Sequence, residues 1–169
     1  MRREPRLRDL FLVVILFLLF LVYLAGALPN NDLLWFWPFF NEKPERIVIH
    51  HAGQESVLTP SSLGYIELTQ AINSSLSQVK GLQGTVGLSE ATMKEYMIKE
   101  LVLEIFYAEP VLIHLPFLFS RPDSLLIPLT GRLSETRVVF GGVDAQYRPG
   151  ALSLKTTEPI KEALEAIGY

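Results

Sequence analysis

Cysteine is absent from this chain of 169 residues. Its absence excludes disulfide bonds, cysteine-based catalysis and anchoring through a lipid-modified cysteine. A folded domain must therefore be stabilised by packing alone. This composition fits a bacterial or archaeal surface protein better than a small animal ectodomain.

Positive charge is also scarce over most of the chain. From Pro44 to the end of the sequence, acidic residues outnumber lysine and arginine and leave a net charge of −4. A mildly acidic surface repels phosphate backbones, so nucleic acid is not expected as a partner. The glycines at 81, 84 and 87 do not match the spacing of a phosphate-binding loop.

A long apolar run occurs once, from Leu10 to Leu28, and it contains no charged residue. A helix of this length spans about 28 Å, which is close to the hydrocarbon thickness of a bilayer. The polar sequence Pro29-Asn30-Asn31-Asp32 ends the run. The run predicts a single transmembrane anchor over residues 10–28.

Basic residues flank this run on one side. The next lysine or arginine after the run is Lys43, whereas four arginines precede it: Arg2, Arg3, Arg6 and Arg8. Because basic flanks stay in the cytoplasm, residues 1–9 are predicted to form a cytoplasmic tail at the cell membrane and residues 30–169 to lie outside the cytoplasm. The alternative is a cleaved signal peptide, with Ala25-Gly26-Ala27 as the cleavage site.

Aromatic residues are concentrated directly after the run. Tryptophan and phenylalanine favour the lipid headgroup region, where the ring lies in an apolar layer and the indole N–H stays hydrated. Residues 29–43 are therefore interpreted as an interfacial aromatic belt and linker, which favours a retained anchor. The belt consists of Trp35, Phe36, Trp37, Phe39 and Phe40.

Residues 44–169 are long enough for one hydrophobic core. Alternating apolar residues and β-branched runs predict strands, and Pro128 suggests an edge position or a bulge for the strand that contains it. Glu100 and Glu104 share one face of a half-buried strand and are expected to be solvated. The predicted strands cover 46–51, 56–59, 99–107, 111–115, 124–130, 137–140 and 151–155.

Three helices are predicted in the same region. The first runs from Ser61 or Ser62 to about Lys80, with Gly81 as its stop signal. The second starts at the N-cap Ser89 and ends near Ile98, and the third starts at Thr156 or Thr157 and ends at Gly168. Grouped strands with helices at both ends predict an α+β domain over 44–169, with a mainly antiparallel sheet of about five to seven strands and about three helices.

The three histidines are His50, His51 and His114. Neighbouring residues of a strand point to opposite faces, so His50 and His51 are not expected to bind one metal ion together. Pairing with His114 would still require a third ligand from Glu104 or Glu109. We expect one packed and one solvated histidine, with no metal and no cofactor.

Catalytic signatures are weak. Ser134, His114 and Asp144 supply the residue types of a hydrolytic triad, but no motif brings them together. A membrane-tethered hydrolase that uses His114 or His51 is therefore the alternative function.

The segment from Leu115 to Pro122 places large apolar residues between prolines. It is either a loop folded on the core or an exposed tip that contacts the bilayer or a protein partner. The contact residues in the second case are Phe117, Leu118 and Phe119.

Arginines recur among glycines in the last third of the chain. Arg132, Arg137 and Arg148 would suit a small anionic ligand, which makes a sensor domain a further alternative. Arginines on solvent-facing strand positions explain the same pattern.

The predicted plan is a basic tail, one span and an outer α+β domain. It is similar in architecture to bacterial single-pass regulators that hold a sensor kinase or an envelope complex through span and ectodomain together. The likeness is one of architecture only. The retained span, the aromatic belt, the apolar loop and the absence of a catalytic constellation predict a non-catalytic binding or accessory protein whose partners are the lipid bilayer and a membrane or envelope protein. No residue role follows from the likeness.

Overall fold

The computed structural model describes residues 7–169, except for the side chains of Asn30 and Arg148. Arg2, Arg3 and Arg6 of the predicted basic tail lie outside the described residues. The chain divides into two compact units. The helical unit contains the chain up to Trp37 together with His114–Phe119, and the sheet unit contains Pro38–Ile113 and Ser120–Tyr169.

The helical unit is built on α1, Leu7–Asn30. The apolar run therefore forms a helix, which continues two residues beyond the predicted span and includes Pro29 in its last turn. Between Leu7 and Pro29 the helix is long and apolar enough to cross a membrane, and most of its side chains are exposed.

The sheet unit contains seven strands in the order β2-β1-β4-β5-β6-β7-β3. Every neighbouring pair is antiparallel, so the predicted α+β class with an antiparallel sheet is confirmed. The strands are β1 Arg46–His51, β2 Gln54–Leu58, β3 Val79–Gln83, β4 Val102–Phe106, β5 Ser124–Pro128, β6 Val138–Val143 and β7 Gln146–Leu154.

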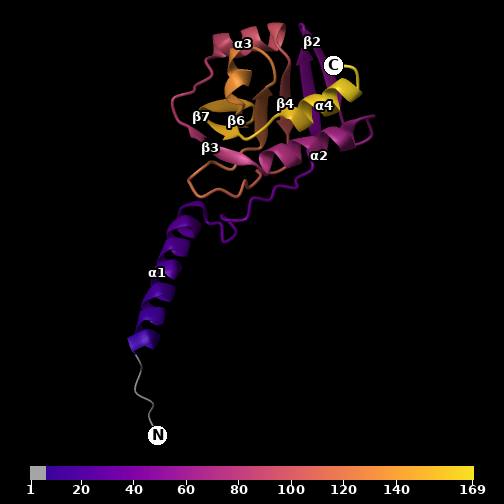
Figure 1. Cartoon of the computed structure of the whole chain (residues 1–169). Helices are drawn as coiled ribbons and strands as arrows, with labels where there is room; N and C mark the ends of the chain where they lie inside the picture. The colour runs from indigo at the N-terminus through magenta and orange to yellow at the C-terminus, as the bar shows by residue number, and fades with distance from the viewer. Residues whose placement is uncertain (1–6) are drawn as a thin grey trace. The chain divides into compact units, whose positions relative to one another are not determined.

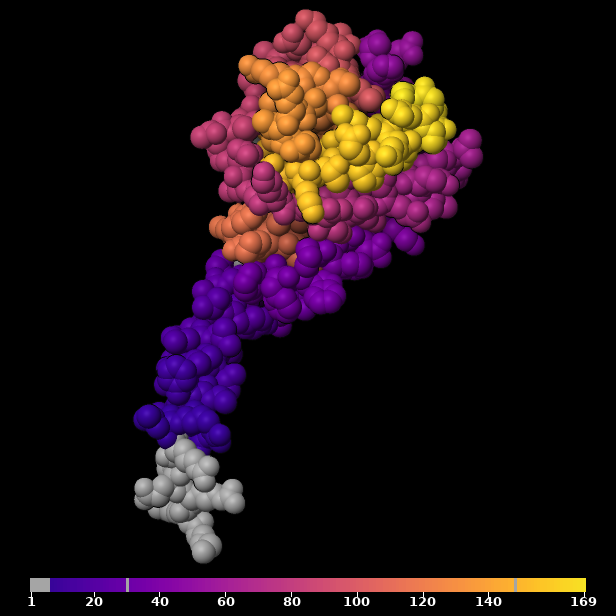
Figure 2. Space-filling view, in the orientation of Figure 1, coloured from indigo at the N-terminus to yellow at the C-terminus, as the bar shows by residue number. Residues whose placement is uncertain are grey.

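One face of the sheet is apolar throughout its centre. Alternate residues of successive strands share this face and are fully buried, as Ile49, Leu103, Ile127, Val139 and Leu152 show. Helices α2, Tyr65–Leu76, and α4, Glu158–Ala166, lie side by side over the sheet (Figure 1). Figure 2 shows α4 in yellow directly against α2 in magenta. Their buried side chains include Leu68, Ile72, Ile160 and Leu164.

The opposite face is covered in part by α3, Glu90–Lys99. Its N-cap prediction is confirmed, because the Ser89 side chain accepts a hydrogen bond from the Thr92 N–H. Tyr96 of α3 packs in a cluster with residues of β4, β5, β6 and β7 and with Leu133, and its hydroxyl accepts a hydrogen bond from the Leu133 N–H at 2.8 Å. The cluster consists of Tyr96, Val102, Leu126, Leu133, Val138, Phe140 and Ala151.

Several predicted boundaries are wrong. The helix predicted to reach Lys80 ends at Leu76, and the next residues form β3 with Gly81 inside the strand. Its N-cap is Gly64 rather than Ser61 or Ser62. Gly64 has a φ of 80°, and a Cβ at this position would collide with Ile167, so glycine is required there.

Two further predictions are wrong, and both concern how a segment pairs with neighbouring strands. Residues 111–115 form no strand, although Val111, Ile113 and Leu115 are buried as their alternation suggests. Pro128 does not mark an edge, because β5 lies between β4 and β6 and the proline is its last residue. This end position leaves the missing N–H of Pro128 harmless to the ladder.

The linker between the units is bound along α2. We call residues 38–45 the strap. Polar side chains of Tyr65 and Asn73 in α2, and of its C-cap residue Ser77, hold the main chain of the strap. The bonds run from the Phe40 N–H to Ser77 Oγ at 2.9 Å, from Asn73 Nδ2 to the Glu42 carbonyl at 3.0 Å, and from the Tyr65 hydroxyl to the Pro44 carbonyl.

We expect Ser77→Ala to loosen the strap. The substitution removes the acceptor of the Phe40 N–H, and a hydrogen bond of this kind contributes about 1 kcal/mol. Amide hydrogen exchange at Phe40 should therefore become faster. Ser74→Ala is the matched control because Ser74 is exposed on the same helix. Equal exchange at Phe40 in both variants would contradict the role of Ser77.

Candidate functional site

The chain folds back on the end of α1 just after the apolar run. The Trp35 indole N–H donates to the Tyr23 carbonyl at 3.1 Å, and the Tyr23 hydroxyl donates to the Leu33 carbonyl at 3.1 Å. A Cβ at Gly26 would collide with the Trp35 ring, so the glycine is what allows this close approach. The turn is thus a structured part of the helical unit.

Asp32 is the polar centre of this turn. It is only 3% exposed, and its Oδ1 accepts a hydrogen bond from the Leu34 N–H at 2.9 Å. Its Oδ2 lies 2.9 Å from Nδ1 of His114. The two residues are 82 positions apart, so no sequence pattern indicated the pair.

The predicted belt residues have different environments. Phe36, Trp37 and Phe39 are each more than half exposed, and Trp35 is partly buried. Phe40 is only 4% exposed and packs edge-on against Tyr107, with ring centroids 6.2 Å apart. Phe40 therefore belongs to the core of the sheet unit and has almost no surface to offer a membrane.

The segment His114–Phe119 also combines buried and exposed side chains. Leu115 is buried, Phe117 and Phe119 are partly buried, and Leu118 is 68% exposed. Of the three predicted contact residues, Leu118 thus presents most of its side chain at the surface.

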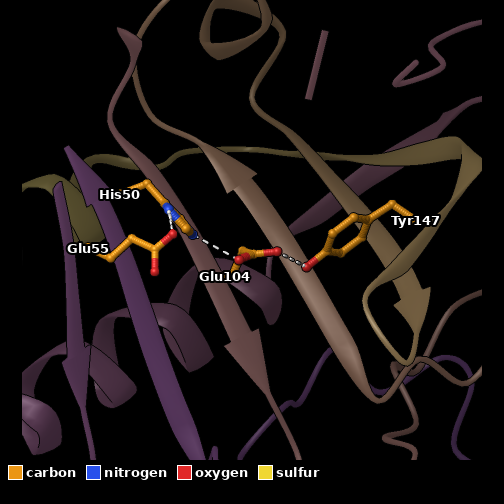
Figure 3. Close-up of polar contacts among 4 residues, drawn as sticks. All are labelled: His50, Glu55, Glu104 and Tyr147. Carbon is orange, nitrogen blue, oxygen red and sulfur yellow. Dashed lines mark hydrogen bonds and ion pairs between the residues drawn. The ribbon is translucent and has the colours of Figure 1, made fainter. Parts of the chain in front are cut away.

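A row of polar side chains crosses the sheet on the face that carries α3 (Figure 3). His50 of β1 places Nε2 2.8 Å from Oε2 of Glu104 on β4, and the Tyr147 hydroxyl of β7 donates to Oε1 of Glu104 at 2.8 Å. Glu55 of β2 extends the row, with Oε1 3.5 Å from His50 Nδ1. The antiparallel register places His50 opposite Glu55 and brings these residues together.

Glu104 corrects a sequence prediction, because it is 8% exposed and not solvated. Burial alone would raise the pKa of its carboxyl group. The hydrogen bonds from His50 and Tyr147, with the charges of His50 and Arg46, outweigh burial and lower the pKa. Burial and the nearby Glu104 charge raise the pKa of Tyr147, which keeps its phenol protonated as a donor.

The carboxylate of Glu104 finds its hydrogen-bond partners within the row. Both carboxylate oxygens of Glu104 have a partner, and both are supplied by other strands of the sheet. Tyr147 also lines a cavity of about 410 Å³ with Leu88, Met93 and Lys94. The row therefore ties β1, β4 and β7 together, and its tyrosine end reaches a small surface cavity.

The other predicted site residues are dispersed. His50 is buried and His51 is exposed, as expected from their adjacent positions, and the His51 ring lies 6.0 Å from that of Tyr169. Within residues 7–169 no group of three or more potential ligands is placed to hold a metal ion. Ser134 donates to the Gly131 carbonyl at 2.7 Å, and Asp144 lies in the turn between β6 and β7.

Two of the three predicted anion-binding arginines lie at the ends of one short element. Arg132 begins the 3₁₀ helix η1, Arg132–Thr136, and Arg137 follows it in a left-handed backbone conformation with a φ of 49°. Arg148 belongs to β7, and its side chain is outside the described part.

An apolar groove lies where α2 and α4 meet the end of the chain. Its volume is about 770 Å³, and its lining combines apolar residues such as Leu58, Leu63 and Ile167 with Glu67 and Glu165. Leu63 is 93% exposed, and the neighbouring Ile66 is also mostly exposed. Large exposed aliphatic side chains beside a groove are typical of a contact surface.

Comparison of the chain with protein-family models, with curated proteins and with solved structures finds no match.

We expect Glu104→Gln to reduce the free energy of unfolding by about 1–3 kcal/mol at neutral pH, as for a buried charged hydrogen-bonding group. Because the pKa of folded Glu104 lies below its ordinary value of 4.5, the stabilisation is complete above that pH. It is lost as the pH falls through the lowered folded-state value. The variant should therefore show a flatter acid dependence in urea unfolding of the detergent-solubilised chain.

Glu55→Gln is the control for this measurement. Glu55 faces the same histidine, but its side chain is 68% exposed, so its loss should change stability by less than about 0.5 kcal/mol. If both variants show the wild-type pH dependence, the polar row does not contribute to stability.

Proposed function

We propose that the protein is a single-pass, membrane-anchored accessory protein that presents its sheet unit outside the cytoplasm to bind a membrane or envelope protein, without catalysis. The observation that carries this proposal is α1, a helix of bilayer length whose side chains are mostly exposed. In water, such a surface would be strongly unfavourable, whereas lipid accommodates it.

The turn after α1 supports retention of the anchor. Trp35 packs on Gly26, inside the Ala25–Ala27 segment that a signal peptidase would have to cleave. The exposed rings of Phe36 and Trp37 follow at the end of the helix, where a lipid headgroup layer would lie. The arginines that precede the run favour a cytoplasmic N-terminal side.

The groove beside Leu63 supports partner binding. It combines apolar lining residues and an exposed leucine with the charged residues Glu67 and Glu165, and many protein contact surfaces have such an apolar centre with polar groups around it. An anchored domain and a partner held in the same membrane meet at a high effective concentration, so a modest groove is sufficient for association. We therefore propose a membrane or envelope protein as the occupant of the groove.

Anchoring predicts that the full chain stays with membranes after alkaline carbonate extraction. Leu19→Arg places a charge at the centre of α1, which costs about 3 kcal/mol for insertion and should shift the protein towards the soluble fraction. Leu7→Arg is the control, because arginine is favoured at the basic end of a span. A mature N-terminus at Leu28, or wild-type protein in a salt-washed supernatant, would contradict the proposal.

Partner binding is tested by affinity purification from detergent-solubilised native membranes. We expect one membrane or envelope protein to accompany the wild-type chain, and Leu63→Asp to reduce its recovery by about tenfold, as for loss of one apolar contact residue. Gln83→Asp adds the same charge at an exposed position of β3 and should leave recovery unchanged. Equal recovery with both variants would argue against the groove, and the absence of a specific companion would argue against the binding function.

A further inference from the structure

Two segments that are far apart in the sequence belong to the helical unit. The turn Asn31–Trp37 follows α1 directly, whereas His114–Phe119 comes from between β4 and β5 of the sheet unit. Figure 1 shows this orange segment beside the end of α1 where the turn begins. Within the described residues, the helical unit therefore consists of α1, the turn that follows it and the segment His114–Phe119.

The pair of Asp32 and His114 fastens these segments to each other. Asp32 is almost fully buried, and a buried carboxylate is strongly unfavourable unless it is paired. Its Oδ2 is 2.9 Å from His114 Nδ1, and the main-chain N–H of Leu34 satisfies Oδ1. The pair thus fixes the start of the segment His114–Phe119 on the turn.

Large apolar side chains form much of the exposed surface of the turn Asn31–Trp37 and the segment His114–Phe119. Four side chains of the turn and one of the downstream segment are each more than half exposed: Leu33, Leu34, Phe36, Trp37 and Leu118. None of them carries a charge, and they belong to the same unit as the last turn of α1. Apolar exposure of this extent costs about 25 cal/mol per Å² in water.

We infer that the segment His114–Phe119 enters the headgroup layer of the bilayer together with the turn Asn31–Trp37, so that Leu118 is a second lipid contact of the protein. This inference rests on the proposed anchoring by α1. The occupant follows from continuity, because the apolar surface begins where a helix of bilayer length ends. Aromatic and aliphatic side chains at that depth meet the boundary between headgroups and acyl chains.

The lack of cysteine makes a direct test possible. The Leu118→Cys variant contains a single thiol, which can be labelled with a fluorophore whose emission depends on the polarity of its surroundings. In vesicles of equal parts phosphatidylcholine and phosphatidylglycerol, we expect a blue-shifted emission for this label. Lipids with a nitroxide near the headgroup should quench it to the same extent as a label at Phe36→Cys.

Two further single-cysteine variants distinguish failure of the lipid contact at Leu118 from failure of the α1 anchor. Gln83→Cys reports on an exposed position of the sheet unit, and Leu19→Cys reports on the centre of α1. If lipids with a deep nitroxide quench the label at Leu19 while the label at Leu118 behaves like the one at Gln83, the lipid contact is wrong and the anchor stands. If Leu19 is not quenched, the anchor fails and the inference with it.

The same label at Leu118 also distinguishes contact with a protein from contact with lipid. A Leu118 label that is unquenched in vesicles, but becomes blue-shifted in native membranes without lipid quenching, would show that a protein covers this segment. That result would overturn the assignment to lipid. Quenching of Leu118 at the level of Phe36 supports it.

Discussion

The antiparallel sheet must bury both of its faces, and this constraint determines the arrangement of the sheet unit. The inner strand β4 has β1 and β5 as neighbours, and all of its residues except Phe106 are buried. One face is aliphatic and needs α2 and α4 as cover. On the other face Glu104 is buried with the apolar cluster under α3, so its carboxylate requires partners from strands on both sides. His50 and Tyr147 supply them.

Local patterns predicted the elements whose signals lie within one segment. The hairpin at Arg46, the capped helix after Ser89 and the antiparallel α+β class were all recovered. The pattern failed where pairing across the sheet decides the structure. Val79–Gln83 contains a glycine and few apolar residues, and it is a strand because β7 offers an edge. Residues 111–115 alternate correctly but have no partner strand.

The candidate sites were less accessible to sequence reasoning for a related reason. Alternation placed Glu104 on a definite face of its strand, but it gave no information on whether that face was covered. The pairing of His114 with Asp32 joins residues 82 positions apart, and its only sequence signal is an acidic residue next to an apolar run. Phe40 belongs to an aromatic cluster by sequence and to the sheet core by structure, because Ser77 and Tyr107 hold it there.

The division of the chain has a consequence for proteolysis. Three peptide bonds connect the two units, after Trp37, after Ile113 and after Phe119. A protease that cuts the strap would break one connection, and the segment His114–Phe119 would remain attached to the turn Asn31–Trp37 through noncovalent contacts such as the Asp32 pair. Shedding of the sheet unit therefore requires two separate events, cleavage followed by dissociation. For a domain on a simple linear tether, the first event alone would suffice.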